Sequence, residues 1–412
     1  MEAYVFENNR KKIFDLMEDK SVLFVESNRL GSDDIFKQSY NVNRNYYFLC
    51  GVLEFDNKII LVKDGEKLEA RIYINPYNEL KAKWVGAPLS KEEVTKLSGI
   101  TDVRYIQSYY RDLEILTDSY KVLYLDIEPT GATEELNHMQ LFAKRLRERN
   151  PWILIENARM LFTKARTVKQ PEEIAEMRKA IEITNKGLKN ILSHMGQMYE
   201  YQLESYFDQE IKFNGATGYA FPTIAASGKN ATCLHYQDNN SIAKEGDLIL
   251  FDLGASLNMY CSDISRTYPV SGKFTPRQKE IYNIVLEGQK LVFNNAKPGI
   301  TTKELNQILI AYFAKELKKI GLIKEDNEVC KYYYHGVSHH IGLDCHDLCE
   351  YTPLKAGSII SNEPGLYIAE EGIGIRIEDD ILITETGAEW LSKDIIKEVD
   401  DIEKFMMENR KQ

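Results

Sequence analysis

The segment "LILFDLGASLNMYCSDISRTYPV", residues 248–270, carries two aspartates in apolar surroundings, one on each side of a polar turn sequence. Both flanks are rich in β-branched and aromatic residues, which predicts two antiparallel strands. We expect a two-residue turn at Leu257 and Asn258, because asparagine tolerates the positive φ that such turns need. That register would place Asp252 directly opposite Asp263, with the two Cβ atoms about 5 Å apart on one face.

Two carboxylates facing each other on apolar strands are an unstable arrangement. Like charges directly opposite each other destabilise a sheet, and a buried carboxylate costs several kcal/mol unless it is compensated. We therefore expect a cation or a shared proton between Asp252 and Asp263.

A second hairpin with the same character is predicted by "IISNEPGLYIAEEGIGIRIEDDILIT", residues 359–384. Centring its turn on Glu370 and Glu371 places Glu363 opposite Glu378, although the following glycines leave room for a longer loop or a bulge. Each acid taken alone is more simply read as a surface residue on a half-exposed strand. Two mirrored pairs instead indicate a divalent metal, and four carboxylates suit two ions about 3.5–4 Å apart with bridging carboxylates and a bridging water or hydroxide.

Histidines gather in "YYYHGVSHHIGLDCHDLC", residues 332–349, which holds four of the seven histidines and two of the six cysteines of the chain. A closed His/Cys zinc cluster would leave the four carboxylates without a purpose, and the histidine spacing with intervening glycines suits an extended loop. We interpret this segment as one wall of the acidic site. Cys345 and Cys349 receive no chemical role, and His340 is expected to be a bystander.

The length of 412 residues predicts two domains, with the boundary just before the helix expected at 171–193. Residues 1–165 alternate strand-like and helix-like segments, which predicts an α/β domain. Residues 166–412 show the order helix, helix, histidine, strand pair twice, which predicts an internal duplication with a pseudo-twofold and a site between the halves. Strands are expected at 22–26, 46–52, 58–63, 71–74 and 122–126, and further helices at 133–149, at 199–213 and after the capping residues Ser90, Thr275 and Thr301.

Composition excludes several classes of protein. The net charge of −11 argues against nucleic acid as a partner, since that needs a basic footprint. No run approaches the roughly 18 apolar residues of a membrane span, and the N-terminus has no signal-peptide core. The scattered cysteines are then expected to be reduced, and the protein to be cytoplasmic.

The ordered set of motifs resembles the pita-bread metallopeptidases, in the aminopeptidase P and prolidase branch. The matching segments are "GYAFPTIAASGKNATCLHY", "LILFDLGASLNMYCSDISRTYPV", "FTPRQKEIYNIVLEGQK", "HGVSHHIGLDCHD", "SNEPGLYI" and "GIGIRIEDDILIT". In the first domain, "YNVNRNYYFLCGVLEFDNKIILV" (40–62) resembles the creatinase-type N-terminal domain of this branch. The resemblance implies an α+β pita-bread catalytic domain at 166–412 after an N-terminal α/β domain at 1–165.

The resemblance also implies roles for individual residues. Its five metal ligands fall on Asp252, Asp263, His339, Glu363 and Glu378. Asp263 and Glu378 would bridge the two ions, and Glu363 would also handle the protons of the nucleophilic water. Non-ligand histidines that hold substrate and stabilise the tetrahedral intermediate fall on His235, His335 and His346, and a supporting arginine falls on Arg376. Two positions depart from the family pattern, namely His340, where an aromatic residue is frequent, and Cys349, where glycine is common.

The implied activity is a metal-dependent aminopeptidase that removes the first residue from peptides with proline in the second position. The metals would be two divalent ions, Mn²⁺ as the first choice and Co²⁺ or Zn²⁺ as alternatives. Ser338 before His339 favours aminopeptidase P over prolidase, an Xaa-Pro dipeptidase with the same metal site. A non-catalytic binding module is the third alternative. Members of this branch usually form homo-oligomers, so a homodimer or a higher homo-oligomer is expected.

Overall fold

The computed structural model describes residues 1–28, 42–350 and 352–411. The chain divides into two compact units, Met1–Ala165 and Arg166–Gln412. The first two residues of the 40–62 segment lie outside the described residues. Within the described ranges, no helix is both long enough and apolar enough to cross a lipid bilayer.

The first unit is built on a six-stranded mixed sheet with strand order β4-β3-β2-β1-β5-β6. β1, β5 and β6 run parallel, as do β3 and β4, while β1, β2 and β3 are joined antiparallel. The strands are β1 (Ser21–Glu26), β2 (Lys58–Asp64), β3 (Lys67–Ile74), β4 (Asp102–Tyr105), β5 (Val122–Leu125) and β6 (Leu154–Asn157). The helices are α1 (Ala3–Leu16), α2 (Arg44–Cys50), α3 (Glu79–Val85), α4 (Lys91–Ser98), the 3₁₀ turn η2 (Ile106–Ser108), α5 (Tyr109–Ser119), α6 (His138–Arg149) and α7 (Arg159–Thr167), which ends just past the boundary.

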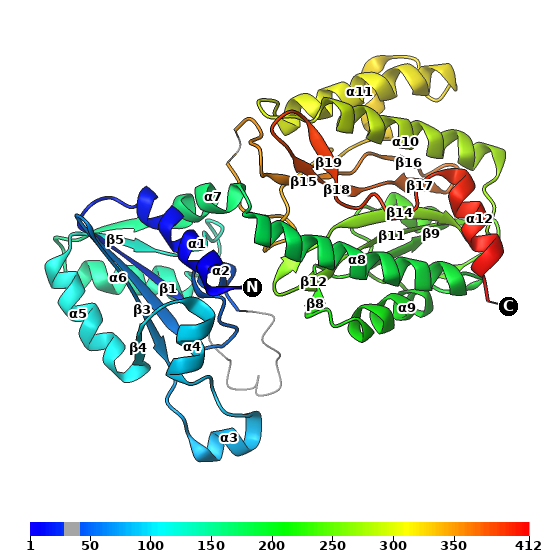
Figure 1. Ribbon diagram of the computed structural model, residues 1–412. Coiled ribbons are helices and arrows are strands. Elements are labelled where there is room, and N and C mark those ends of the chain that lie inside the picture. The colour runs from blue at the N-terminus through cyan, green and yellow to red at the C-terminus, as the bar shows by residue number, and fades with distance from the viewer. Residues whose placement is uncertain (29–41, 351, 412) are drawn as a thin grey trace. The chain divides into compact units, whose positions relative to one another are not determined.

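Helices cover both faces of this sheet, as an α/β domain requires (Figure 1). Apolar side chains of β1, β2 and β5 pack with Leu113 and Leu116 of α5 and with Leu146 of α6 in one core cluster. The capping box expected at Ser90 and Glu93 is present and starts α4.

Two secondary-structure predictions in this unit differ from the structure. The helix expected at 133–149 begins only at His138, because the Asn137 side chain caps it there. Residues 46–52 were expected as a strand, but most of them form helix α2. The Asn43 side chain caps its start by accepting from the backbone N–H groups of Asn45 and Tyr46, and Gly51 ends it with φ 69°. All residues of α2 from Asn45 onward are buried, so no hydrophobic periodicity distinguished helix from strand.

The second unit contains two similar halves, each with a helix pair and a strand pair. The first half has α8 (Pro171–His194), β7 (Met198–Tyr199), α9 (Glu200–Phe213), β8 (Gly218–Tyr219), β9 (Ile224–Ser227), η3 (Gly228–Thr232), β10 (Ile242–Ala243), β11 (Leu248–Leu253), β12 (Ala255–Leu257), β13 (Tyr260–Cys261) and β14 (Ile264–Pro269). The second half has α10 (Pro276–Asn295), α11 (Thr302–Lys319), η4 (Asp326–Lys331), β15 (Ile359–Asn362), β16 (Gly365–Ile368), β17 (Ile373–Arg376), β18 (Asp379–Ile383), β19 (Ala388–Trp390) and the terminal α12 (Val399–Asn409).

The strands of the two halves lie between the two helix pairs (Figure 1). β11 and β14 of the first half contact β17 of the second half, so the two hairpins meet in the centre of the unit. The helix starts predicted from Pro171, Thr275 and Thr301 are all present. The duplicated α+β architecture expected of a pita-bread domain is thereby confirmed.

Candidate active site

The first hairpin turns one residue later than the sequence predicted. Its turn lies at Asn258 and Met259, both with positive φ (48° and 70°), so β12 pairs Leu257 with Tyr260. Asp252 consequently lies opposite Ser265, and the predicted direct pairing of Asp252 with Asp263 is wrong. The residue opposite Asp252 is therefore Ser265, two positions after the predicted Asp263. Because side chains alternate between the two faces of a strand, Asp263 still lies on the same face as Asp252.

The second hairpin has the predicted register. Gly365 pairs with Arg376 on one side and Asn362 pairs with Asp379 on the other, which leaves Glu363 and Glu378 facing each other between them. The connecting loop is longer than two residues, since the strands stop at Ile368 and Ile373, with Gly372 at φ 63°.

The backbone ladder opens where the two glutamates lie. The N–H of Glu378 donates to the carbonyl of Ser265 at 3.0 Å, and that of Glu363 donates to Val337 at 3.0 Å. These bonds tie the second hairpin to the first hairpin and to the histidine segment. All four acids therefore converge from different chain segments.

The nine residues singled out from the sequence line one cavity of about 670 Å³. They are His235, Asp252, Asp263, His335, His339, His346, Glu363, Arg376 and Glu378. The apolar part of the lining includes Phe221, Pro222 and Leu234. His340 does not line the cavity; it is buried and bridges to Ile360.

His339 presents one ring nitrogen to the acids. Its Nδ1 lies 3.1 Å from the carbonyl oxygen of His340, which can only accept, so Nδ1 carries a proton and Nε2 is the ring nitrogen that faces the acids. Nε2 lies 3.3 Å from Asp263 Oδ2 and 3.6 Å from Glu363 Oε1. Burial lowers the pKa of His339, but its hydrogen bond and charge interaction with Asp263 and the charge of Glu363 outweigh burial and raise it to about 9. The surroundings of Nε2 therefore favour a positive charge there.

Burial and mutual repulsion raise the pKa values of the carboxyl groups of Glu378, Glu363 and Asp252. Burial, followed by the charges of Asp263, Glu363 and Asp252, raises the pKa of Glu378 well above its ordinary value. Burial also raises the pKa of Glu363 to about 7, although His339 and Arg376 oppose it, and burial raises that of Asp252. One oxygen of Asp252, Oδ1, is buried without a hydrogen-bond partner. A bound cation would offset both the repulsion and the unmet oxygen.

The donor atoms suit a divalent cation. One ligand-type atom from each of Asp263, His339 and Glu378 lies within 4.8 Å of the other two. Carboxylate oxygens with one imidazole nitrogen form a hard to borderline donor set that binds Mn²⁺, Co²⁺ or Zn²⁺.

Arg376 holds two of the acids in place. Its guanidinium donates to Asp252 Oδ2 at 2.7 Å, to Ser265 Oγ at 2.8 Å and to Tyr367 Oη at 3.1 Å. Ser265 Oγ donates onward to Glu378 Oε2 at 2.7 Å. Sequence reasoning found Arg376 and missed Ser265 and Tyr367. A turn at Asn258 and Met259, had the sequence indicated it, would have placed Ser265 opposite Asp252.

The remaining histidines surround this centre. His335 Nε2 lies 2.8 Å from Tyr367 Oη, and burial, followed by the charge of Arg376, lowers its pKa to about 4. The His346 ring stacks on His339 with centroids 4.0 Å apart, and burial lowers its pKa as well. His235 is exposed at the cavity wall, in the loop after η3. Imidazole nitrogens that face a cavity can donate or accept a hydrogen bond to a bound peptide.

Cys345 is a cavity residue to which sequence reasoning assigned no role. Its thiol donates to Asp263 Oδ2 with a sulfur–oxygen distance of 2.9 Å. No pattern in the sequence pointed to this contact, because the loop from His339 to His346 brings the sulfur back toward the first hairpin only in three dimensions.

Comparisons with known proteins agree with this geometry. The model of metallopeptidase family M24 matches residues 175–385, and that of the aminopeptidase P N-terminal domain matches residues 6–124. An Xaa-Pro aminopeptidase of Escherichia coli is 32% identical over 403 residues, which cover 90% of each chain. Solved structures span this chain from end to end, and two of them are described next. A Bacillus anthracis protein described as a candidate aminopeptidase P has a TM-score of 0.96 and 42% identity, with 99% of its own chain covered. The zinc-substituted E. coli aminopeptidase P in complex with product has a TM-score of 0.89 and 29% identity, with its whole chain covered.

Proposed function

The chain belongs to metallopeptidase family M24, and from this premise we propose that it is an Xaa-Pro aminopeptidase, which removes the N-terminal residue from peptides with proline in the second position. The observation that carries the proposal is the convergence of four carboxylates and the Nε2 of His339 on one cavity. No observation favours a dipeptidase. A non-catalytic binding module would not need four acids held together against their mutual repulsion.

The residues present fit a metal centre, as the unpartnered Oδ1 of Asp252 and the position of His339 Nε2 beside Asp263 and Glu363 indicate. We propose that two divalent ions would be held by Asp252, Asp263, His339, Glu363 and Glu378. Mn²⁺ is the starting hypothesis for their identity. The chemistry supplied by the ions when bound is polarisation of the scissile carbonyl and activation of water near neutral pH.

Side chains of the protein would transfer the protons and bind the peptide. Glu363, next to His339 and steadied by a 3.1 Å hydrogen bond from Ser361 Oγ, would take the proton of the attacking water and return it to the departing amine. His235, His335 and His346 would hold the peptide and donate to the oxyanion of the tetrahedral intermediate. Arg376 would keep Asp252 and, through Ser265, Glu378 in the ligating orientation.

The proposed domain boundaries are consistent with the ranges of the two family matches. We propose that residues 1–165 form the creatinase-type N-terminal domain and residues 166–412 the catalytic domain; the matches over 6–124 and 175–385 support this. A cytoplasmic homodimer or higher homo-oligomer is proposed on the resemblance alone. Light scattering of the purified protein and cell fractionation test these two points.

The decisive assay compares a tripeptide with a dipeptide. We expect metal-dependent release of alanine from Ala-Pro-Ala, loss of that activity on chelation, and its return with added Mn²⁺. Asp263→Ala and Glu378→Ala should each lose both bound metal and activity, while Asp394→Ala, a change at an exposed acid of the same unit, should keep both. Rapid cleavage of Ala-Pro alone would identify a dipeptidase, and full activity in Asp263→Ala would rule out the metal site.

A further inference from the structure

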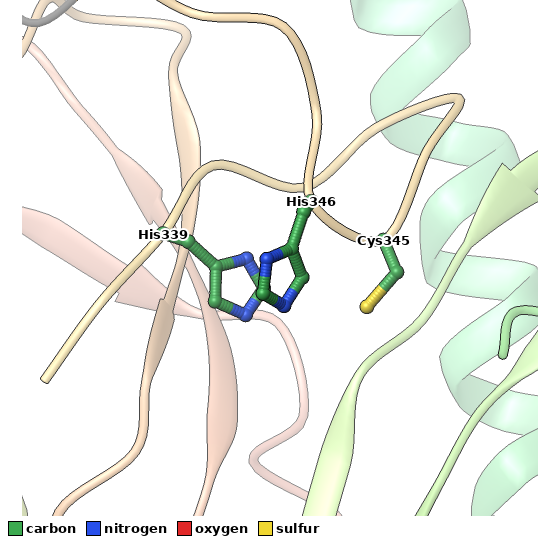
Figure 2. A group of neighbouring side chains, drawn as sticks. All are labelled: His339, Cys345 and His346. Atoms are coloured by element: carbon green, nitrogen blue, oxygen red, sulfur yellow. The ribbon is translucent and has the colours of Figure 1, made fainter. Parts of the chain in front are cut away.

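The sulfur of Cys345 lies among the proposed metal ligands. Sγ is 2.9 Å from Asp263 Oδ2, the same carboxylate oxygen that lies 3.3 Å from His339 Nε2. In addition, one ligand-type atom from each of His339, Cys345 and His346 lies within 4.8 Å of the other two. Figure 2 shows the two imidazole rings face to face and the Cys345 side chain beside them, all carried by one loop.

The loop that carries Cys345 is anchored on both sides of it. Arg166 donates to Asp344 Oδ2 at 2.6 Å and also binds Asp347, and Lys169 Nζ donates to Asp347 Oδ2 at 2.9 Å. Arg166, Lys169 and Asp347 are buried, and the N–H of Asp347 donates to the carbonyl of His340 at 2.8 Å. Asp347 is held by two buried ion pairs and Asp344 by a half-buried one, so the fold sets the position of the sulfur between them.

The neighbours of Cys345 distinguish a ligand from a small apolar side chain. The buried Cys50 and Cys261 donate weakly to backbone carbonyl oxygens, as space-filling cysteines do. Here the sulfur meets a carboxylate oxygen and lies near two imidazoles, groups that share a cation with a thiolate in zinc and cobalt sites. Cys349, four residues later on the same segment, is half-buried and is not among the described residues that line the cavity.

We propose that Cys345 supplies a sulfur ligand to the metal ion held by Asp263 and His339, and that it shifts the preference of the site from Mn²⁺ toward Zn²⁺ or Co²⁺. Thiolate is a soft donor that favours Zn²⁺ and disfavours hard oxygen-seeking ions. Coordination replaces the S–H bond with a sulfur–metal bond and releases one proton to solvent. The inference rests on the proposed function, because it concerns the ion in that same site.

Cobalt reports directly on a sulfur ligand. A Co²⁺–thiolate bond gives a charge-transfer band in the near ultraviolet, which oxygen and nitrogen ligands do not give. We expect the full-length protein loaded with Co²⁺ to show this band, Cys345→Ser to lose it, and Cys349→Ser to keep it. In competition between Zn²⁺ and Mn²⁺, Cys345→Ser should lose roughly tenfold or more of its relative preference for Zn²⁺.

The outcomes separate this inference from the function on which it rests. Bound Co²⁺, with cleavage of Ala-Pro-Ala but without the band in the unmodified protein, would overturn the role of Cys345 and leave the peptidase standing. A band that persists in folded, cobalt-loaded Cys345→Ser would assign the sulfur elsewhere and overturn it too. Absence of both bound Co²⁺ and cleavage would remove the proposed function itself. Because the unmodified protein alone gives a decisive spectrum, the test does not depend on the variant folding.

Discussion

Asp379, the residue after Glu378, is predicted to be a stability centre of the second unit. It is fully buried and accepts from Arg266 Nη2 at 2.6 Å, from Lys397 Nζ at 2.7 Å and from Gln289 Nε2 at 3.0 Å. Burial raises the pKa of Asp379, but Arg266 and Lys397 outweigh burial and hold the pKa below its usual value. Arg266 in turn contacts the carbonyl oxygen of Glu378, so this network also supports the backbone of a proposed ligand.

Replacing Asp379 with asparagine would leave the charges of Arg266 and Lys397 without their carboxylate. Breaking a buried ion pair by removing one partner costs about 3–5 kcal/mol. The second unit has 247 residues, counted from Arg166 to Gln412. In domains of about this size, 1 kcal/mol shifts the unfolding midpoint by roughly 2–4 °C, so the expected loss for Asp379→Asn is about 6–20 °C.

Tryptophan fluorescence can follow this transition selectively. Trp390 is the one tryptophan of the second unit, and its ring stacks on Phe293 at 4.0 Å beneath the Lys397 ammonium. Trp84 and Trp152 of the first unit are exposed, so their emission should change little on unfolding.

The matched control is Asp394→Asn, which removes the same charge from an exposed position of the same unit. Surface changes of this kind stay within about 0.5 kcal/mol. If Asp379→Asn melted with the control and the unmodified protein, the buried network would have no net stabilising role and the reasoning would fail.

Three further predictions concern metal, packing and pH. Chelation should lower the melting temperature of the second unit, since a metal at 100 times its Kd stabilises by about 2.7 kcal/mol; an unchanged melt after verified metal removal would contradict the site. Gly374→Ala should cost about 1–3 kcal/mol and reduce kcat, because its Cβ would lie 2.1 Å from the carbonyl oxygen of Ala231, just before His235. Gly387→Ala, with open space around it, is the control that should change neither stability nor kcat. Burial raises the pKa of Asp347, but the charges of Arg166 and Lys169 outweigh burial and hold the pKa below its usual value. The stabilising contribution of Asp347 is therefore present above the unfolded pKa of about 3.9 and is lost as pH falls through the lower folded pKa. Denaturant titrations of Asp347→Asn should therefore show a deficit relative to the unmodified protein that is constant above about pH 5 and shrinks in stronger acid.

Local chemistry made several elements predictable. Proline or threonine at a helix start, with a glutamine or glutamate three residues later, marked α10 and α11 because these side chains satisfy exposed N–H groups of the first turn. The register of the second hairpin followed from centring its turn on Glu370 and Glu371, and the five acid and imidazole positions followed from ordered motifs. The α2 segment was predicted wrongly because its residues are buried on all sides, so its sequence has no hydrophobic periodicity that separates helix from strand.

By itself, the amino-acid sequence determined the class of each unit, the duplicated plan of the second and the set of acids that share a face, because side-chain alternation and capping depend only on near neighbours along the chain. Only the tertiary structure decided which atoms meet. The turn at Asn258 and Met259 set the offset of Asp252 from Asp263, Ser265 joined Arg376 to Glu378, and the Cys345 thiol met Asp263 across 82 residues of chain. Such contacts depend on the summed packing of segments far apart in sequence, which no local pattern encodes.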